Sequence, residues 1–129
     1  MLFVCSCEIV KSPDYYKLND DDTVASFTKA VGERKVSGQN ISMSNATQVI
    51  TYSYKDVKDP YGDAEKYIDY LSGEEDFSYS GMLNMDEKAD TITLSKKSPN
   101  NKDYIIRVTI KYDVGPETVK ITVERERAY

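Results

Sequence analysis

The chain has 129 residues, with no histidine, no tryptophan and only two cysteines. The absence of histidine excludes Ser-His-Asp and Cys-His catalysis, a histidine general base and every zinc site that needs a histidine ligand. Cys5 and Cys7 cannot complete a tetrahedral zinc site by themselves. Phosphate-binding loops, dinucleotide-binding glycine patterns and nucleophile elbows are also missing from the sequence. We therefore predict no catalytic residue, no metal site and no cofactor.

Long hydrophobic runs and clusters of positive charge are missing too. No stretch approaches the roughly 18 to 20 apolar residues of a membrane span. The net charge is −5, and the 17 basic residues are scattered along the chain. Arg125 and Arg127 come closest to a basic cluster, but they alternate with Glu124 and Glu126 as in a mixed-charge strand end. Because nucleic acids and anionic membranes are bound by grouped Lys and Arg, we expect neither as a partner. The expected partner is a protein, and a small ligand is the alternative.

We expect an N-terminal segment over residues 1–20 and a single α+β domain over residues 21–129. The start of the chain has no basic region and is too short for a secretory signal. Val4-Cys5-Ser6-Cys7 resembles the end of a bacterial lipoprotein leader, which would make Cys7 the lipidated residue. The protein would then be extracytoplasmic and reach a membrane only through this anchor. The open alternative is a short first strand with both thiols buried on one face.

Residues 11–22 are predicted to form a polar loop that ends at the start of a helix. Its three consecutive aspartates lack the alternating ligand spacing of a calcium loop, so Asp21 or Asp22 is interpreted as the helix cap. A helix of about three turns is predicted from Thr23 to Gly32. Its apolar positions at helical spacing are Val24, Phe27, Ala30 and Val31.

The middle of the chain is predicted to contain strands and a second helix. Residues 36–45 indicate a weak edge strand, and residues 47–57 alternate as a strand with Ile50, Tyr52 and Tyr54 on one face. Asp63 is the predicted cap of a helix that ends at Gly73. The apolar stripe of this helix comprises Ala64, Tyr67, Ile68 and Leu71.

Residues 76–127 alternate as four antiparallel strands with one buried face. The predicted inner residues are Phe77, Leu83, Ile92, Leu94, Ile106, Val108, Ile110, Val119, Ile121 and Val123. In the last hairpin these positions are even-numbered on one strand and odd-numbered on the other. A register that keeps both sets on one face requires a loop of two or four residues around Val114-Gly115-Pro116.

The predicted fold class is α+β, with a curved antiparallel sheet of five or six strands, a C-terminal four-strand meander and two helices covering one face. This order of elements resembles the curved-sheet cones of the nuclear transport factor and ketosteroid isomerase class. It resembles cystatin-like sheets more loosely. The resemblance implies a sheet that curves around a helix, and it does not determine function.

Tyrosine is enriched, with 11 residues against three phenylalanines. Tyr15, Tyr16, Tyr61 and Tyr70 lie outside the predicted apolar stripes and form a candidate interaction surface, because exposed tyrosines are common at binding sites. The alternative is ordinary half-buried packing. Tyrosines predicted on inner faces could instead line a ligand cavity: Tyr52, Tyr54, Tyr79, Tyr104 and Tyr112.

Three hypotheses of function follow from these features. The first is a non-catalytic interaction or accessory domain, in the form of a bacterial extracytoplasmic lipoprotein. The second is a small-ligand-binding or simple enzymatic domain shaped as a cone. The third is a small acidic inhibitor or immunity-type protein whose charge would speed its association with a basic partner.

Overall fold

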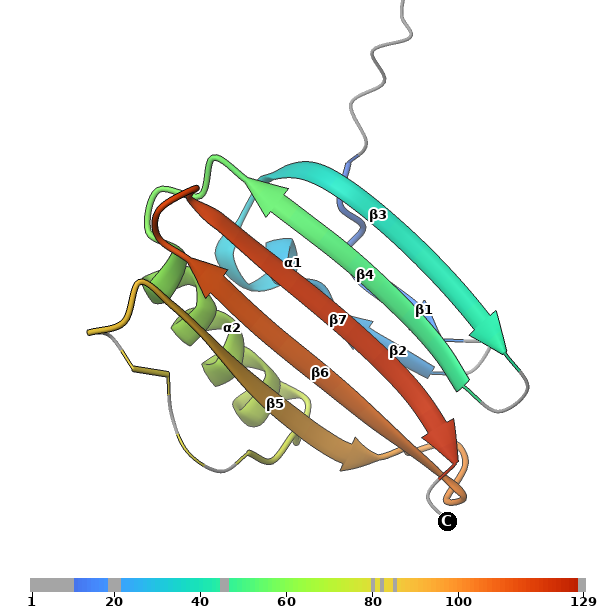
Figure 1. Ribbon diagram of the computed structural model, residues 1–129. Helices are drawn as coiled ribbons and strands as arrows, with labels where there is room; N and C mark the ends of the chain where they lie inside the picture. Colours follow the sequence, from blue (N-terminus) through green and yellow to red (C-terminus); the bar gives the residue numbers. More distant parts are fainter. Residues whose placement is uncertain are drawn as a thin grey trace, which may run out of the picture.

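The computed structural model describes residues 11–18, 22–44, 47–79, 81, 83–84 and 86–127. The strands and helices follow one another along the chain as β1 (Tyr15–Leu18), β2 (Asp22–Ala25), α1 (Phe27–Val31), β3 (Lys35–Ser44), β4 (Thr47–Lys55), α2 (Pro60–Glu74), β5 (Ala89–Lys97), β6 (Tyr104–Asp113) and β7 (Thr118–Arg127). Five strands form an open antiparallel sheet in the order β3-β4-β7-β6-β5, and β1 and β2 form a separate hairpin. Both helices and this hairpin lie on one side of the sheet (Figure 1). The predicted α+β class is confirmed.

The last hairpin has the register that the alternation predicts. Val108 lies opposite Val123, and residues 114–117 form the expected four-residue connection between β6 and β7. Val108, Ile110, Val119, Ile121 and Val123 are fully buried. The inner face of β4 is also confirmed, because Ile50, Tyr52 and Tyr54 are all buried.

Ile110 provides a direct test of this one-sided burial. Replacing Ile110 with alanine should lower the free energy of unfolding by about 2–4 kcal/mol, because a fully buried side chain is lost and a cavity remains. The neighbouring Lys111 is exposed, so Lys111→Ala should cost no more than about 0.5 kcal/mol. Urea unfolding of both variants measures the difference. Equal losses would contradict the assignment of the two faces.

The prediction for residues 11–32 is wrong in its first half. Tyr15–Leu18 pairs with Asp22–Ala25 as an antiparallel hairpin, where a loop and the first turns of a helix were expected. α1 begins only at Phe27, and its cap is Ser26, whose side chain accepts a hydrogen bond from the Lys29 amide. Asp22 is a buried strand residue, and Asp21 lies outside the described residues. Gly32 ends the helix as expected.

The second helix starts earlier than expected. Asp59 is its cap and accepts a hydrogen bond from the Gly62 amide, and Pro60 occupies the first turn, where its missing N–H costs nothing. Asp63 is therefore a first-turn residue, and Gly73 lies inside the last turn. The predicted apolar stripe is confirmed, since its four members are buried.

The described part of the segment 76–85 does not form the expected fourth meander strand. It makes an isolated bridge between Ser78 and Ser95 instead. Phe77 and Leu83 are buried as predicted, whereas Tyr79 is exposed. The C-terminal meander thus has three strands, β5, β6 and β7.

Aromatic rings join the helices to the sheet. The Phe27 ring of α1 lies 4.9 Å from the Tyr54 ring of β4 and 5.7 Å from the Tyr67 ring of α2, measured between centroids. The Tyr67 hydroxyl donates to the Ala25 carbonyl over 2.7 Å. These rings occupy part of the space between the helices and the sheet, where the ligand-binding hypothesis places a cavity.

Candidate functional site

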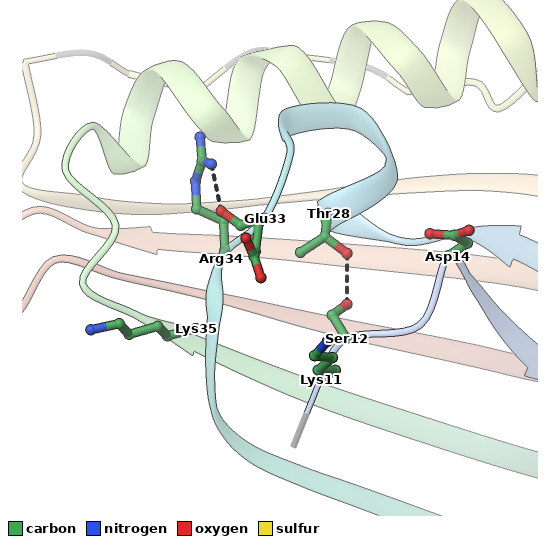
Figure 2. A pocket seen from close by; sticks show the side chains of 7 residues that line it. All are labelled: Lys11, Ser12, Asp14, Thr28, Glu33, Arg34 and Lys35. Carbon is green, nitrogen blue, oxygen red and sulfur yellow. Dashed lines mark hydrogen bonds between the residues drawn. The ribbon is translucent and has the colours of Figure 1, made fainter. Parts of the chain in front are cut away.

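A hollow of about 670 Å³ lies at the rim of the domain, between the N-terminal segment, α1 and the connection from α1 to β3. Figure 2 shows the side chains around it. They are mostly polar or charged: Lys11, Ser12, Asp14, Thr28, Glu33, Arg34 and Lys35. None of the tyrosines predicted to line a ligand cavity is among these side chains.

Arg34 is held in place by α2. Its Nε donates to Asp63 Oδ2 over 2.8 Å, and a terminal nitrogen donates to Oδ1 over 3.2 Å. A second terminal nitrogen donates to the Glu33 carbonyl over 2.9 Å (Figure 2). These bonds engage all three guanidinium nitrogens, and the bidentate pair with Asp63 holds the start of β3 against α2. Since Asp14 and Glu33 offset Lys11 and Lys35, the hollow presents a balanced charge to a ligand.

A chain of hydroxyl groups runs from this hollow into the core. Thr28 Oγ1 donates to Ser12 Oγ over 2.8 Å, as Figure 2 shows. Ser12 Oγ shares a 2.8 Å hydrogen bond with the Tyr54 hydroxyl, which shares a 2.7 Å bond with the Tyr16 hydroxyl. The chain ends at the Phe27 amide, which donates to the Tyr16 hydroxyl over 3.1 Å. It ties the N-terminal segment to α1, β1 and β4.

Burial makes the phenol groups of the core tyrosines weaker acids than free tyrosine. It raises the pKa of Tyr54 to about 12, although the hydrogen bonds from Ser12 and Tyr16 act in the opposite direction. Burial also raises the pKa of Tyr16 and of Tyr67 well above the ordinary value of 10.0. At neutral pH these hydroxyls are therefore protonated, and they serve as hydrogen-bonding groups in the fold.

Tyr54→Phe tests the hydroxyl chain. At neutral pH the variant should lose about 1 kcal/mol, because Ser12 and Tyr16 each lose a partner. A phenol whose pKa is higher in the folded than in the unfolded protein stabilises the fold. This contribution is complete below pH 10 and is lost as the pH rises towards 12. Wild-type stability should therefore fall between these pH values, and the fall should be shallower in Tyr54→Phe. Urea unfolding at pH 7 and across this alkaline range measures both effects.

Tyr52→Phe is the matched control at neutral pH. Tyr52 lies on the same face of β4 and its ring stacks on Tyr16, but its hydroxyl is not part of the chain. Its removal should cost less than the removal of the Tyr54 hydroxyl. Identical alkaline profiles for wild type and Tyr54→Phe would contradict the role assigned to Tyr54.

The structure does not gather the four tyrosines of the predicted interaction surface into one patch. Tyr15 is 40% exposed on β1, and Lys29 Nζ lies 5.6 Å from its ring centroid. Tyr16 is only 2% exposed, so its predicted surface position is corrected to a core position. Tyr61 packs against Tyr112 at 5.5 Å between ring centroids, and Tyr70 is half-buried on α2. Cys7 lies outside the described residues.

The free edge of β3 is a feature that the sequence prediction recognised as a strand but not as a site. β3 pairs with β4 on one side, and no described strand pairs with its other side. Ile41 and Met43 lie opposite Ile50 and Gln48, so they belong to the inner face of the sheet. Yet they are 54% and 67% exposed. The apolar inner face therefore continues beyond the elements that cover it.

The lack of charge around β3 can be seen in the sequence and indicates an unprotected edge strand. No charged residue occurs between residues 36 and 54, although 30% of the chain is charged. Natural edge strands are usually protected by lysine, proline or other blocking features. In β3 these features are confined to its start, where Lys35 is the first residue and the register shifts between Val36 and Gly38.

The opposite edge of the sheet is protected. β5 carries Asp90, Lys96 and Lys97, and Ser78 exchanges two 2.9 Å backbone hydrogen bonds with Ser95. The Lys96 side chain also donates to the Glu75 carbonyl over 2.8 Å. Among the described residues the two edges thus differ, and the edge of β3 is the one left open to another strand.

Comparisons with known proteins identify no relative. No protein-family model matches the chain, and neither the curated proteins nor the solved structures contain a match. Within the described residues, no three acidic or cysteine side chains come together as a metal-binding group. The helices of that part of the chain are too short or too polar to cross a membrane.

Proposed function

We propose that this protein is a non-catalytic interaction domain that binds a polypeptide by adding a strand to the free edge of β3. The observation that carries the proposal is the ten-residue strand β3, which has no charged residue after Lys35 and exposes Ile41 and Met43 beside its open edge. A strand paired on one side leaves about half of its N–H and C=O groups facing outward. These groups supply affinity in strand addition, and side chains on either face supply specificity.

The alternatives have less support from the packing. The interior is occupied by rings such as Phe27, Tyr54 and Tyr67, and the rim hollow is open and balanced in charge. The hydroxyl chain consists of protonated groups at neutral pH, so it supplies no general base there. An extended polypeptide on β3 uses backbone groups that no described strand pairs with.

Site-specific photocrosslinking tests the proposal. A benzophenone amino acid is placed at Ser42 of β3 or, as the matched control, at Thr93 of β5; both side chains are exposed on edge strands. After irradiation in cells that express the protein, we expect an adduct with another polypeptide chain at Ser42, at least fivefold more abundant than at Thr93. Equal yields, or no adduct at Ser42, would overturn the proposal.

A further inference from the structure

We infer that the strand added to β3 comes from a second copy of this chain, so that two sheets join into one across a twofold axis. This inference rests on the proposed function, because it names the partner of the same edge. The resulting interface is isologous, with the same surface contributed by both copies.

Charge favours a second copy at this edge over other faces. Each copy carries a net charge of −5, so most approaches bring like charges together. The stretch from residue 36 to residue 54 includes β3 after Lys35 and β4 before Lys55, and it contributes no charge to such an encounter. Two β3 strands can therefore approach without charge repulsion at the contact itself.

The regular part of β3 determines the register. A bulge lies between Val36 and Gly38, and regular pairing extends from Gly38 to Ser44. An antiparallel twofold pair that keeps both inner faces on one side must match odd positions with odd positions. The midpoint of residues 38–44 is Ile41, which would lie opposite the Ile41 of the second copy. Met43 would then lie opposite the Gln39 of the second copy.

The exposed apolar side chains fit this arrangement. Ile41 lies next to buried Ile50 on the inner face, so two copies would bring their Ile41 side chains together beside their cores. Pairing would remove apolar surface from water and would use the outward backbone groups of both strands. Each copy would cover the apolar side chains and pair with the outward backbone groups that the other copy leaves exposed.

Charge-swap variants test the twofold register. Sedimentation velocity over a range of concentrations should show a reversible dimer for the wild type. Ile41→Lys and Ile41→Glu each place two like charges opposite each other, so each should weaken association at least tenfold. An equal mixture of the two variants places opposite charges together and should restore the dimer. Since Ile41 is more than half exposed, the urea midpoints of both variants should stay near the wild-type value at a protein concentration where the wild type is monomeric.

Thr93→Lys on β5 is the matched control and should leave the dimer unchanged. Added salt should strengthen association, because it screens the repulsion between two acidic copies. A wild-type chain that stays monomeric at its highest soluble concentration would overturn the second-copy inference. A mixture of the charge variants that fails to dimerise would overturn it as well. A crosslink from Ser42 to a different polypeptide would overturn the second-copy inference but support strand addition. The absence of any crosslink at Ser42 would overturn both the second-copy inference and strand addition.

Discussion

Arg125→Met is expected to lower the free energy of unfolding by about 3–5 kcal/mol, because it leaves a buried carboxylate without its cation. Arg125 Nε lies 2.8 Å from Asp22 Oδ2, and the two side chains are 4% and 1% exposed. Ser98 Oγ and Asn100 Nδ2 donate to the same carboxylate over 2.6 and 2.9 Å. The Arg125 guanidinium also lies 4.2 Å from the Tyr104 ring centroid. Urea unfolding measures the loss.

Two further variants isolate the ion pair. Arg107 pairs with Glu126 on the outward face, with side chains about a third exposed, so Arg107→Met should cost no more than about 1 kcal/mol. Combining Asp22→Asn with Arg125→Met removes both charges. This double variant should be more stable than Arg125→Met alone. Additive losses in the double variant would show that the two side chains are not coupled.

Phe27→Ala is the second large effect, with an expected loss of about 3–5 kcal/mol. The Phe27 side chain is fully buried and contacts both the Tyr54 and Tyr67 rings. Its removal leaves a cavity where α1, α2 and β4 meet. Thermal or urea unfolding gives the magnitude.

Lys29→Ala is the matched control on the same short helix. Lys29 is exposed and contacts Tyr15 only as a cation near an aromatic ring, which is worth about 0.5–1 kcal/mol at an exposed site. A loss from Phe27→Ala no larger than that of Lys29→Ala would mean that α1 is not anchored through its aromatic side chain.

The sheet could be predicted from the sequence where alternation continues over long strands. Val108 and Ile110 face Val123 and Ile121, because a period of two places all four on one face. The same alternation puts Arg125 on the inner face of β7. A charge in that position requires a buried partner, and the sequence could not show that Asp22 supplies it from β2.

The part of the fold before β3 could not be predicted in the same way. Val24, Phe27 and Val31 fit a helical stripe, but Val24 is buried in a strand that pairs with Tyr16. Short elements such as β1 and α1 depend on tertiary contacts more than on local preference. The pairing of Asp22 with Arg125 lies far outside any local sequence window.

The candidate site was predicted only in part. The edge strand over residues 36–45 was expected, but its importance depends on β3 being the last strand of the sheet, which is a property of topology. For Tyr16 the prediction was wrong. Its polar sequence context suggested an exposed side chain, but the ring lies in the core and its hydroxyl is hydrogen-bonded to Tyr54 and to the Phe27 amide.

Amide hydrogen exchange across β3 tests the claim that this edge accepts a strand most directly. In dilute protein, the amides of residues 38–44 that face away from β4 should exchange rapidly. As the concentration of the protein rises, we expect these alternate amides to gain protection, while the amides of β5 stay unchanged. Ile41→Lys should abolish the gain. Exchange at β3 that does not depend on concentration, or a gain that is equal at β5, would contradict strand addition by a second copy.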